Sequence, residues 1–367
     1  MNSGKKRYIT GLKGLACLSV MLGHYFGILS SFPKPGFALL EIIYKSQFYY
    51  LIRSGYWLQL FYAVSGYLVS KTIITSFSEL VKKCIMRFLR FALPVFFVYM
   101  GLFVIDRTIG FHNADTVSIF TKIDYQQHYY QGSRSFMDYL AGPFRLLILN
   151  DCSLNGPYWV LHAMFLSSLY IYCMRYLKKY IVNDGVFFTA QAIIISFLMI
   201  TDRTVYFGCL VGMLLGMYED KMYETVRSQY FAFLILLAAL LRNSLPALFI
   251  DGLASVFIIL FVPRLRFLDV FLSSRPVNFL GEISWDIFSF HWPVLCSFGA
   301  VAMLKTFTGD NLAATFWAGL GVSILVTFAI SAAYYFTFDK LTEAIMSFLK
   351  KKLFPVRPDK QEQLPVS

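Results

Sequence analysis

The sequence predicts an all-α, polytopic membrane protein with about ten transmembrane helices and both termini in the cytoplasm. Hydrophobic residues make up 57% of the 367 residues, and only 15% are charged. Apolar runs are spread along the whole chain, so no separate soluble domain is expected. Lysines and arginines cluster in alternate loops, so the net charge of +12 indicates membrane orientation and not nucleic-acid binding.

The first expected span, Leu12–Phe32, is long enough to cross a bilayer and carries two ionisable residues. Lys13 begins it and His24 lies near its middle, about three helical turns and about 16 Å further along nearly the same stripe. Ionisable groups at membrane depth are costly and usually mark a site. We interpret the stripe as a ligand path. Alternatively, Lys13 anchors the helix at the cytoplasmic surface and His24 bonds a neighbouring helix.

Hydropathy predicts nine further spans, and the basic loops between them predict their orientation. Residues 1–345 are expected to form one membrane domain with a long external loop at 106–157, and residues 346–367 a basic cytoplasmic tail. The six cysteines show no zinc-like spacing, so neither a metal site nor a disulfide framework is expected. The further spans are expected at residues 55–74, 86–105, 158–177, 185–200, 204–217, 230–241, 245–262, 283–304 and 312–336.

Arg87 and Arg90 share one helix face where the third span leaves the cytoplasm. Two guanidinium groups on one face suit a phosphate or pyrophosphate, which arginine binds through paired hydrogen bonds. The alternative is that both arginines only anchor the helix on its cytoplasmic side.

Two other spans carry polar residues that need an explanation. Ser65 and Gly66 lie in the middle of the second span, where small residues favour close helix packing, although the hydroxyl is also a candidate site group. His291 lies in the ninth span at a depth comparable to that of His24, and the helix-breaking Pro293 follows it. We therefore expect the two imidazoles to converge. The alternative is that His291 is a core histidine bonded to a neighbour.

Together these stretches resemble the acyltransferase-3 family, integral membrane O-acyltransferases common in bacteria. The family's hallmark is a basic residue, ten residues and then a histidine, as in Lys13 to His24. The order and spacing of the matching stretches extend the resemblance over almost the whole chain. The other stretches are FYAVSGYLVS (61–70), RFLR (87–90) with Pro94, NGPYWVLHAMF (155–165), TVYFGCLVGMLLGM (204–217), FLGEISWDIFSFHWPV (279–294) and residues 335–341.

The sequence departs from the family pattern at two positions. Thr10 stands where an acidic residue often precedes the glycine of the first motif, and Met164 stands where many members carry a glutamate five residues after Trp159. If that glutamate has a catalytic role in other members of the family, another group performs the role here or the reaction proceeds without it.

The resemblance implies transfer of an acyl group, usually acetyl from acetyl-CoA, to a hydroxyl of a carbohydrate or lipid-linked glycan in a bacterial inner membrane. No metal cofactor is implied. Lys13, Arg87 and Arg90 would hold the phosphates of acyl-CoA. His24 would act as general base or transient acyl carrier, and His291 would orient His24 or the thioester. The remaining candidate site residues, all in matching stretches, are Ser65, Trp159 and Ser284.

A second class of function fits some of the same residues. A transporter or flippase for a polysaccharide or its lipid-linked precursor also uses intramembrane histidines and arginines. The chain lacks the internal repeat that many such transporters carry, which argues against this function. Dependence on acyl-CoA discriminates between the two classes. A third alternative is a degenerate family member with a structural or sensing role.

Overall fold

The computed structural model describes residues 7–27, 54–116, 119, 128–201, 203, 206–225 and 247–354. Every regular element in these residues is helical, which confirms the all-α class. The principal helices are α1 (Arg7–Gly27), α4 (Ser54–Ser70), α5 (Phe77–Thr108), α6 (Asn113–Thr116), α8 (Phe136–Leu149), η1 (Gly156–Tyr158), α9 (Trp159–Leu177), α10 (Asp184–Ile200), α11 (Phe207–Thr225), α13 (Ala247–Phe261), η3 (Val262–Arg264), α14 (Arg266–Leu272), α15 (Arg275–Glu282), α16 (Ser284–Val294), η4 (Leu295–Gly299), α17 (Ala300–Thr306), α18 (Leu312–Tyr334), η5 (Tyr335–Asp339) and α19 (Lys340–Leu353).

Five of the described helical segments are long and apolar enough to cross a membrane, which supports a multi-pass membrane protein. They coincide with the first, third, fourth, ninth and tenth expected spans. The second, fifth, sixth and eighth are also helical, as α4, α10, α11 and α13, but these helices are shorter or less apolar. The seventh, 230–241, lies outside the described residues. The five segments are 7–27, 77–108, 156–177, 284–306 and 312–352.

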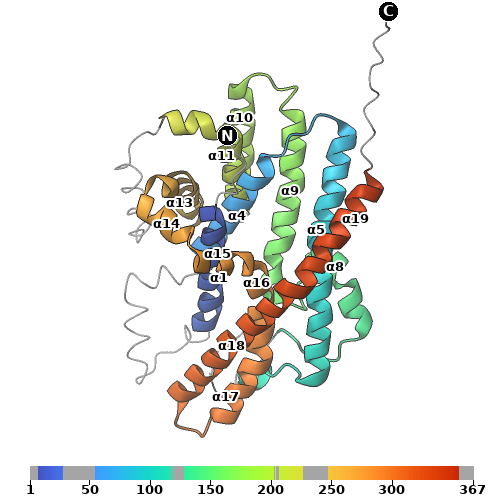
Figure 1. The fold of residues 1–367 in the computed structure, drawn as a ribbon, viewed down its shortest axis with the longest axis vertical. Helices are drawn as coiled ribbons and strands as arrows, with labels where there is room; N and C mark the ends of the chain where they lie inside the picture. Colours follow the sequence, from blue (N-terminus) through green and yellow to red (C-terminus); the bar gives the residue numbers. More distant parts are fainter. Residues whose placement is uncertain are drawn as a thin grey trace, which may run out of the picture.

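The last three elements form one long rod. Figure 1 shows α18, η5 and α19 running on from one another, beside α17 at the lower end and towards α5 at the upper end. The main cluster of buried side chains among the described residues comes chiefly from α1, α5, α8, α9, α16 and α18, and its fully buried aromatic residues include Tyr99, Tyr158 of η1 and Trp292. This core surrounds the region where the candidate site residues lie.

Helices α4 and α11 pack closely through glycine. A methyl group on Gly66 of α4 would overlap the carbonyl oxygen of Cys209, and one on Gly212 of α11 would overlap that of Ala63. Small residues allow helix backbones to approach in this way. The close packing predicted for Gly66 is therefore confirmed.

Substituting Gly66 with alanine is expected to lower the free energy of unfolding by about 1–3 kcal/mol, because the added methyl group forces α4 and α11 apart. Thermal unfolding of the detergent-purified protein measures the loss. Gly55→Ala, near the start of α4, is the matched control, since a methyl group there meets no neighbouring side chain or helix within 4 Å among the described residues. Equal melting temperatures for the two variants would contradict this expectation.

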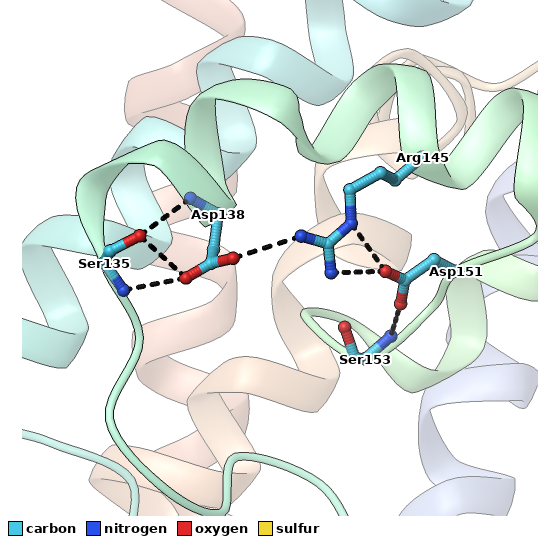
Figure 2. Close-up of polar contacts among 5 residues, drawn as sticks. All are labelled: Ser135, Asp138, Arg145, Asp151 and Ser153. Carbon is cyan, nitrogen blue, oxygen red and sulfur yellow. Dashed lines mark hydrogen bonds and ion pairs between the residues drawn. The ribbon is translucent and has the colours of Figure 1, made fainter.

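The segment predicted as an external loop contains a regular helix, α8, whose ends are held by polar contacts (Figure 2). Ser135 caps the first turn, and its backbone N–H donates to Asp138 at 2.8 Å. Arg145 on the same helix donates to Asp138 at 3.1 Å and to Asp151 beyond the helix end at 2.8 Å. The backbone N–H of Ser153 donates to Asp151 at 3.1 Å. These contacts tie the connection after α8 to the helix.

Acid is expected to weaken this network. Partial burial opposes ionisation of Asp151, but hydrogen bonds from Ser153 and Arg145 outweigh it and hold the pKa of Asp151 below its usual value. A lowered carboxylate pKa stabilises the fold above the unfolded-state pKa of about 4, and the contribution disappears as the pH falls through the folded-state value.

Asp151→Asn is therefore expected to lower the melting temperature by about 2 °C or less near neutral pH, since partly exposed ion pairs contribute little. The difference from the wild type should vanish well below about pH 4. Thermal scans of both proteins across this pH range test the expectation. A difference that stays constant with pH would contradict it.

Candidate active site

A cavity of about 430 Å³ lies between the helices of the main core. Its volume falls in the range of small-molecule binding sites. Apolar side chains form most of its wall, and charged groups enter from α1, α5 and the rod that ends in α19. The lining residues are Lys13, Leu58, Phe61, Arg87, Arg90, Phe91, Pro94, Val160, Leu161, Met164, Ser284, Trp285, Phe288, Asp339, Thr342 and Glu343.

Three positively charged side chains line this cavity, and Arg87 makes the most clearly defined contacts of the three. Its Nη2 donates to the Ser65 hydroxyl at 3.5 Å, and its guanidinium lies 4.7 Å from the centre of the Phe91 ring. Its Nε is buried and has no hydrogen-bond partner among the described residues. Arg90, one turn further along α5, is exposed, and Lys13 enters from α1. A buried N–H without a partner is costly, so this group needs a hydrogen-bond acceptor from a ligand or from water.

A series of aromatic rings connects Arg87 to the deeper histidine. Phe91 lies 6.4 Å from Trp285, and Trp285 lies 6.4 Å from Tyr158. Tyr158 lies 6.0 Å from Phe288, and Phe288 lies 5.9 Å from His291, all measured between ring centres. Because Phe91, Trp285 and Phe288 line the cavity, one wall of it leads from the cations towards the histidine.

His24 of α1 and His291 of α16 come together beyond Phe288, with ring centres 5.2 Å apart. The predicted convergence of the two imidazoles is therefore confirmed. His291 Nδ1 lies 2.8 Å from the Phe288 carbonyl oxygen and 3.1 Å from that of Ile287. A carbonyl only accepts hydrogen bonds, so Nδ1 carries a proton, and in the neutral ring Nε2 presents a lone pair. This Nε2 has no partner in the described part of the chain.

The helix that carries His291 continues through Pro293 instead of breaking there. Proline has no N–H, so the carbonyl of Ser289, four residues earlier, loses its helical partner. Asn155 donates its side-chain N–H to this oxygen at 2.8 Å. A π-helical turn, η4, follows at Leu295–Gly299, and such turns often accompany functional sites. Asn155 thus stabilises the helix next to the histidine pair.

Next to the histidine pair, Trp292 lies edge-on to His24, with ring centres 5.5 Å apart. Tyr129, in the segment that precedes α8, packs on Trp292 with ring centres 5.6 Å apart. Asn113 donates to the Tyr129 carbonyl at 3.0 Å and holds this residue in place. The segment before α8 therefore reaches the histidine pair through Trp292.

The chain matches a known protein family over nearly its whole length. The acyltransferase-3 family model, described as an acyltransferase domain, matches residues 6–336. The chain belongs to this family. No curated protein and no solved structure matches it.

Most of the residues proposed from the sequence gather in one part of this acyltransferase-3 domain. Lys13, Arg87, Arg90 and Ser284 all line the cavity. His24 and His291 lie together beyond it, and Ser65 contacts the cavity through its hydrogen bond to Arg87. Trp159 does not line the cavity, and its side chain is 36% exposed. Met164, which replaces the glutamate of many family members, is part of the apolar wall.

Sequence reasoning missed two groups of cavity residues in this acyltransferase-3 domain. The ring of Phe91 lies one helical turn after Arg87, a spacing from which the stacking contact was predictable. Asp339 lies in the matching stretch 335–341 but was not among the residues predicted for the site. Thr342 and Glu343 carry no comparable signal, because on the sequence they resemble the polar face of a surface helix. Only the course of the rod brings them to the cavity.

Proposed function

We propose that this acyltransferase moves an acetyl group from acetyl-CoA to a hydroxyl of a cell-surface carbohydrate, such as O-antigen, capsule or exopolysaccharide, in a bacterial inner membrane. The observation that carries the proposal is the cavity itself. It gathers Lys13, Arg87 and Arg90, and its aromatic wall leads to His291 and His24. This arrangement suits a ligand with phosphates at one end and a reactive carbonyl at the other.

In this proposal the phosphates of acetyl-CoA bind to the arginines of α5 and to Lys13. Guanidinium groups bind phosphate oxygens through paired hydrogen bonds, and the buried Nε of Arg87 gains a partner when they do. The donor enters from the cytoplasm, where acetyl-CoA is made and where the basic loops of the chain are expected to lie.

The proposed reaction places His24 next to the thioester. As general base, a neutral imidazole takes the proton of the acceptor hydroxyl while the hydroxyl oxygen attacks the thioester carbonyl carbon. The carbon–sulfur bond then breaks, and the CoA thiolate takes the proton from His24. Alternatively, a nitrogen of His24 attacks the thioester carbonyl first, the carbon–sulfur bond breaks, and the CoA thiolate leaves with the proton of the other ring nitrogen. The acceptor hydroxyl oxygen then attacks the acetyl group on His24, the carbon–nitrogen bond breaks, and the hydroxyl proton returns to the imidazole.

His291 positions His24 in this mechanism. Two backbone carbonyls hold its Nδ1, which leaves its Nε2, an atom without a partner among the described residues, to accept a hydrogen bond from the His24 ring in the proposed reaction. Such a bond would fix which nitrogen of His24 carries the proton. The acceptor glycan approaches from the side of Tyr129, whose partly exposed ring offers a stacking surface for a sugar.

The test is transfer of radiolabelled acetyl from acetyl-CoA to the glycan fraction of membranes that contain the protein. Label that appears only with the protein and only with acetyl-CoA supports the proposal. A folded protein that neither binds acetyl-CoA nor labels any glycan contradicts it and favours the transporter alternative, for which glycan flux is the next measurement.

A further inference from the structure

One wall of the cavity is formed by residues that follow the part of the chain matched by the family. The match ends at residue 336, whereas Asp339, Thr342 and Glu343 line the cavity from the end of η5 and the first turn of α19. Their spacing, three and four residues, places all three on one helix face. Figure 1 shows this part of the rod beside α5, which carries the arginines.

Thr342 is the most informative residue of this wall. It is only 9% exposed, and its hydroxyl oxygen is buried without a hydrogen-bond partner among the residues that the structure describes. The indole Nε1 of Trp285, in the same cavity, is likewise buried and without such a partner. A buried hydroxyl and a buried N–H on residues that line a cavity need ligand or water partners, since leaving them unsatisfied is costly.

The charges on this wall exclude the phosphates of a donor. Asp339 and Glu343 flank Thr342 with carboxylates, while the cations of the cavity come from α1 and α5. Phosphates are attracted to the cations and repelled by the carboxylates. The part of the donor that lies against α19 is therefore uncharged and polar.

We propose that α19 binds the pantetheine arm of the acyl donor through the Thr342 hydroxyl. This inference rests on the proposed function. The arm carries two amides, and a hydroxyl both donates to an amide carbonyl and accepts from an amide N–H. Trp285 donates to a second carbonyl, and Asp339 accepts from an N–H. The arm is the uncharged part that has to pass from the phosphates to Phe288 and the histidines, whereas the adenine lies beyond the phosphates.

Isothermal titration of the detergent-purified full chain with two probes tests this. Acetyl-CoA contains the arm, and adenosine 3′,5′-bisphosphate lacks it. Thr342→Val keeps the shape of the side chain but removes the hydroxyl. We expect it to weaken acetyl-CoA binding about threefold to tenfold, the effect of one buried hydrogen bond, and to leave bisphosphate binding unchanged.

Two further variants serve as controls. Thr342→Ser retains the hydroxyl and is expected to bind acetyl-CoA like the wild type. Thr337→Val changes an exposed threonine of the same rod, outside the cavity, and is expected to have no effect. Three results would overturn the inference: unchanged acetyl-CoA binding by Thr342→Val, equal weakening of both probes, or equal weakening by the valine and serine variants.

The same titrations separate this inference from the proposed function. If the wild type binds neither probe, the donor site itself is absent and both fail. If the wild type binds acetyl-CoA and the paired arginine substitution abolishes that binding, but Thr342→Val does not weaken it, only the role of α19 fails.

Discussion

His24→Ala is expected to reduce acetyl transfer about 10²- to 10⁴-fold, the usual contribution of a general base. Binding of acetyl-CoA should change little, because the cations of the cavity, and not His24, hold the phosphates in the proposed site. Initial rates with labelled acetyl-CoA, together with titration of the purified variant, measure the two effects separately. A loss of transfer without loss of binding assigns His24 to the chemical step.

His162→Ala is the matched control for this substitution. His162 lies in α9, another apolar helix, bonds to the Leu147 carbonyl at 2.9 Å and does not line the cavity. Its variant should transfer acetyl at the wild-type rate once expression is equalised. Full activity of His24→Ala would refute both roles proposed for this residue. Label that stays on the wild-type protein without acceptor, but not on His24→Ala, would favour the acyl carrier over the general base.

The double substitution Arg87→Ala/Arg90→Ala is expected to weaken acetyl-CoA binding at least about 100-fold. Hydrogen bonds to charged groups contribute about 1.5–3 kcal/mol each, and the two arginines supply at least two of them. Isothermal titration of the purified variant beside the wild type gives the affinities. Adenosine 3′,5′-bisphosphate should lose affinity by a similar factor, because the arginines bind the phosphates.

Arg203→Ala controls for the loss of positive charge as such, since Arg203 is exposed and lies outside the cavity. The affinity of the Arg203→Ala protein for acetyl-CoA should equal that of the wild type. Replacing both cavity arginines with lysine keeps the charge and removes the paired hydrogen bonds, so it should give an intermediate affinity. Wild-type affinity in Arg87→Ala/Arg90→Ala would show that the cavity does not bind the donor through these residues.

Much of this site was predictable from the sequence, because helical periodicity determines which residues share a face. Lys13 and His24 lie on the one helix α1, and Arg87 and Arg90 on the one helix α5, as their spacing predicts. The small residue Gly66 indicated a close helix contact by its type and position alone, since only a residue without a side chain permits the approach. Apolar runs likewise predicted the positions of the spanning helices.

Contacts between distant helices were decided by the tertiary structure. Periodicity states which face a residue occupies but not which other helix packs against that face. The matching depth of His24 and His291 in their spans suggested that the two residues meet. The packing of α1 against α16 is what places their ring centres 5.2 Å apart. The Asn155 bond that compensates for Pro293 also joins segments far apart in the chain.

The wall of the cavity formed by α19 shows most clearly what the sequence determined and what tertiary packing decided. By sequence, Thr342 belongs to a polar helix that follows the last apolar run, and nothing in that pattern distinguishes a solvated hydroxyl from a buried one. The continuous rod from α18 through η5 directs this face onto the cavity beside α5, where the hydroxyl loses its contact with water. Burial depends on the neighbouring helices, so the sequence alone determined the residue types of the site, and tertiary packing decided which of them share a cavity.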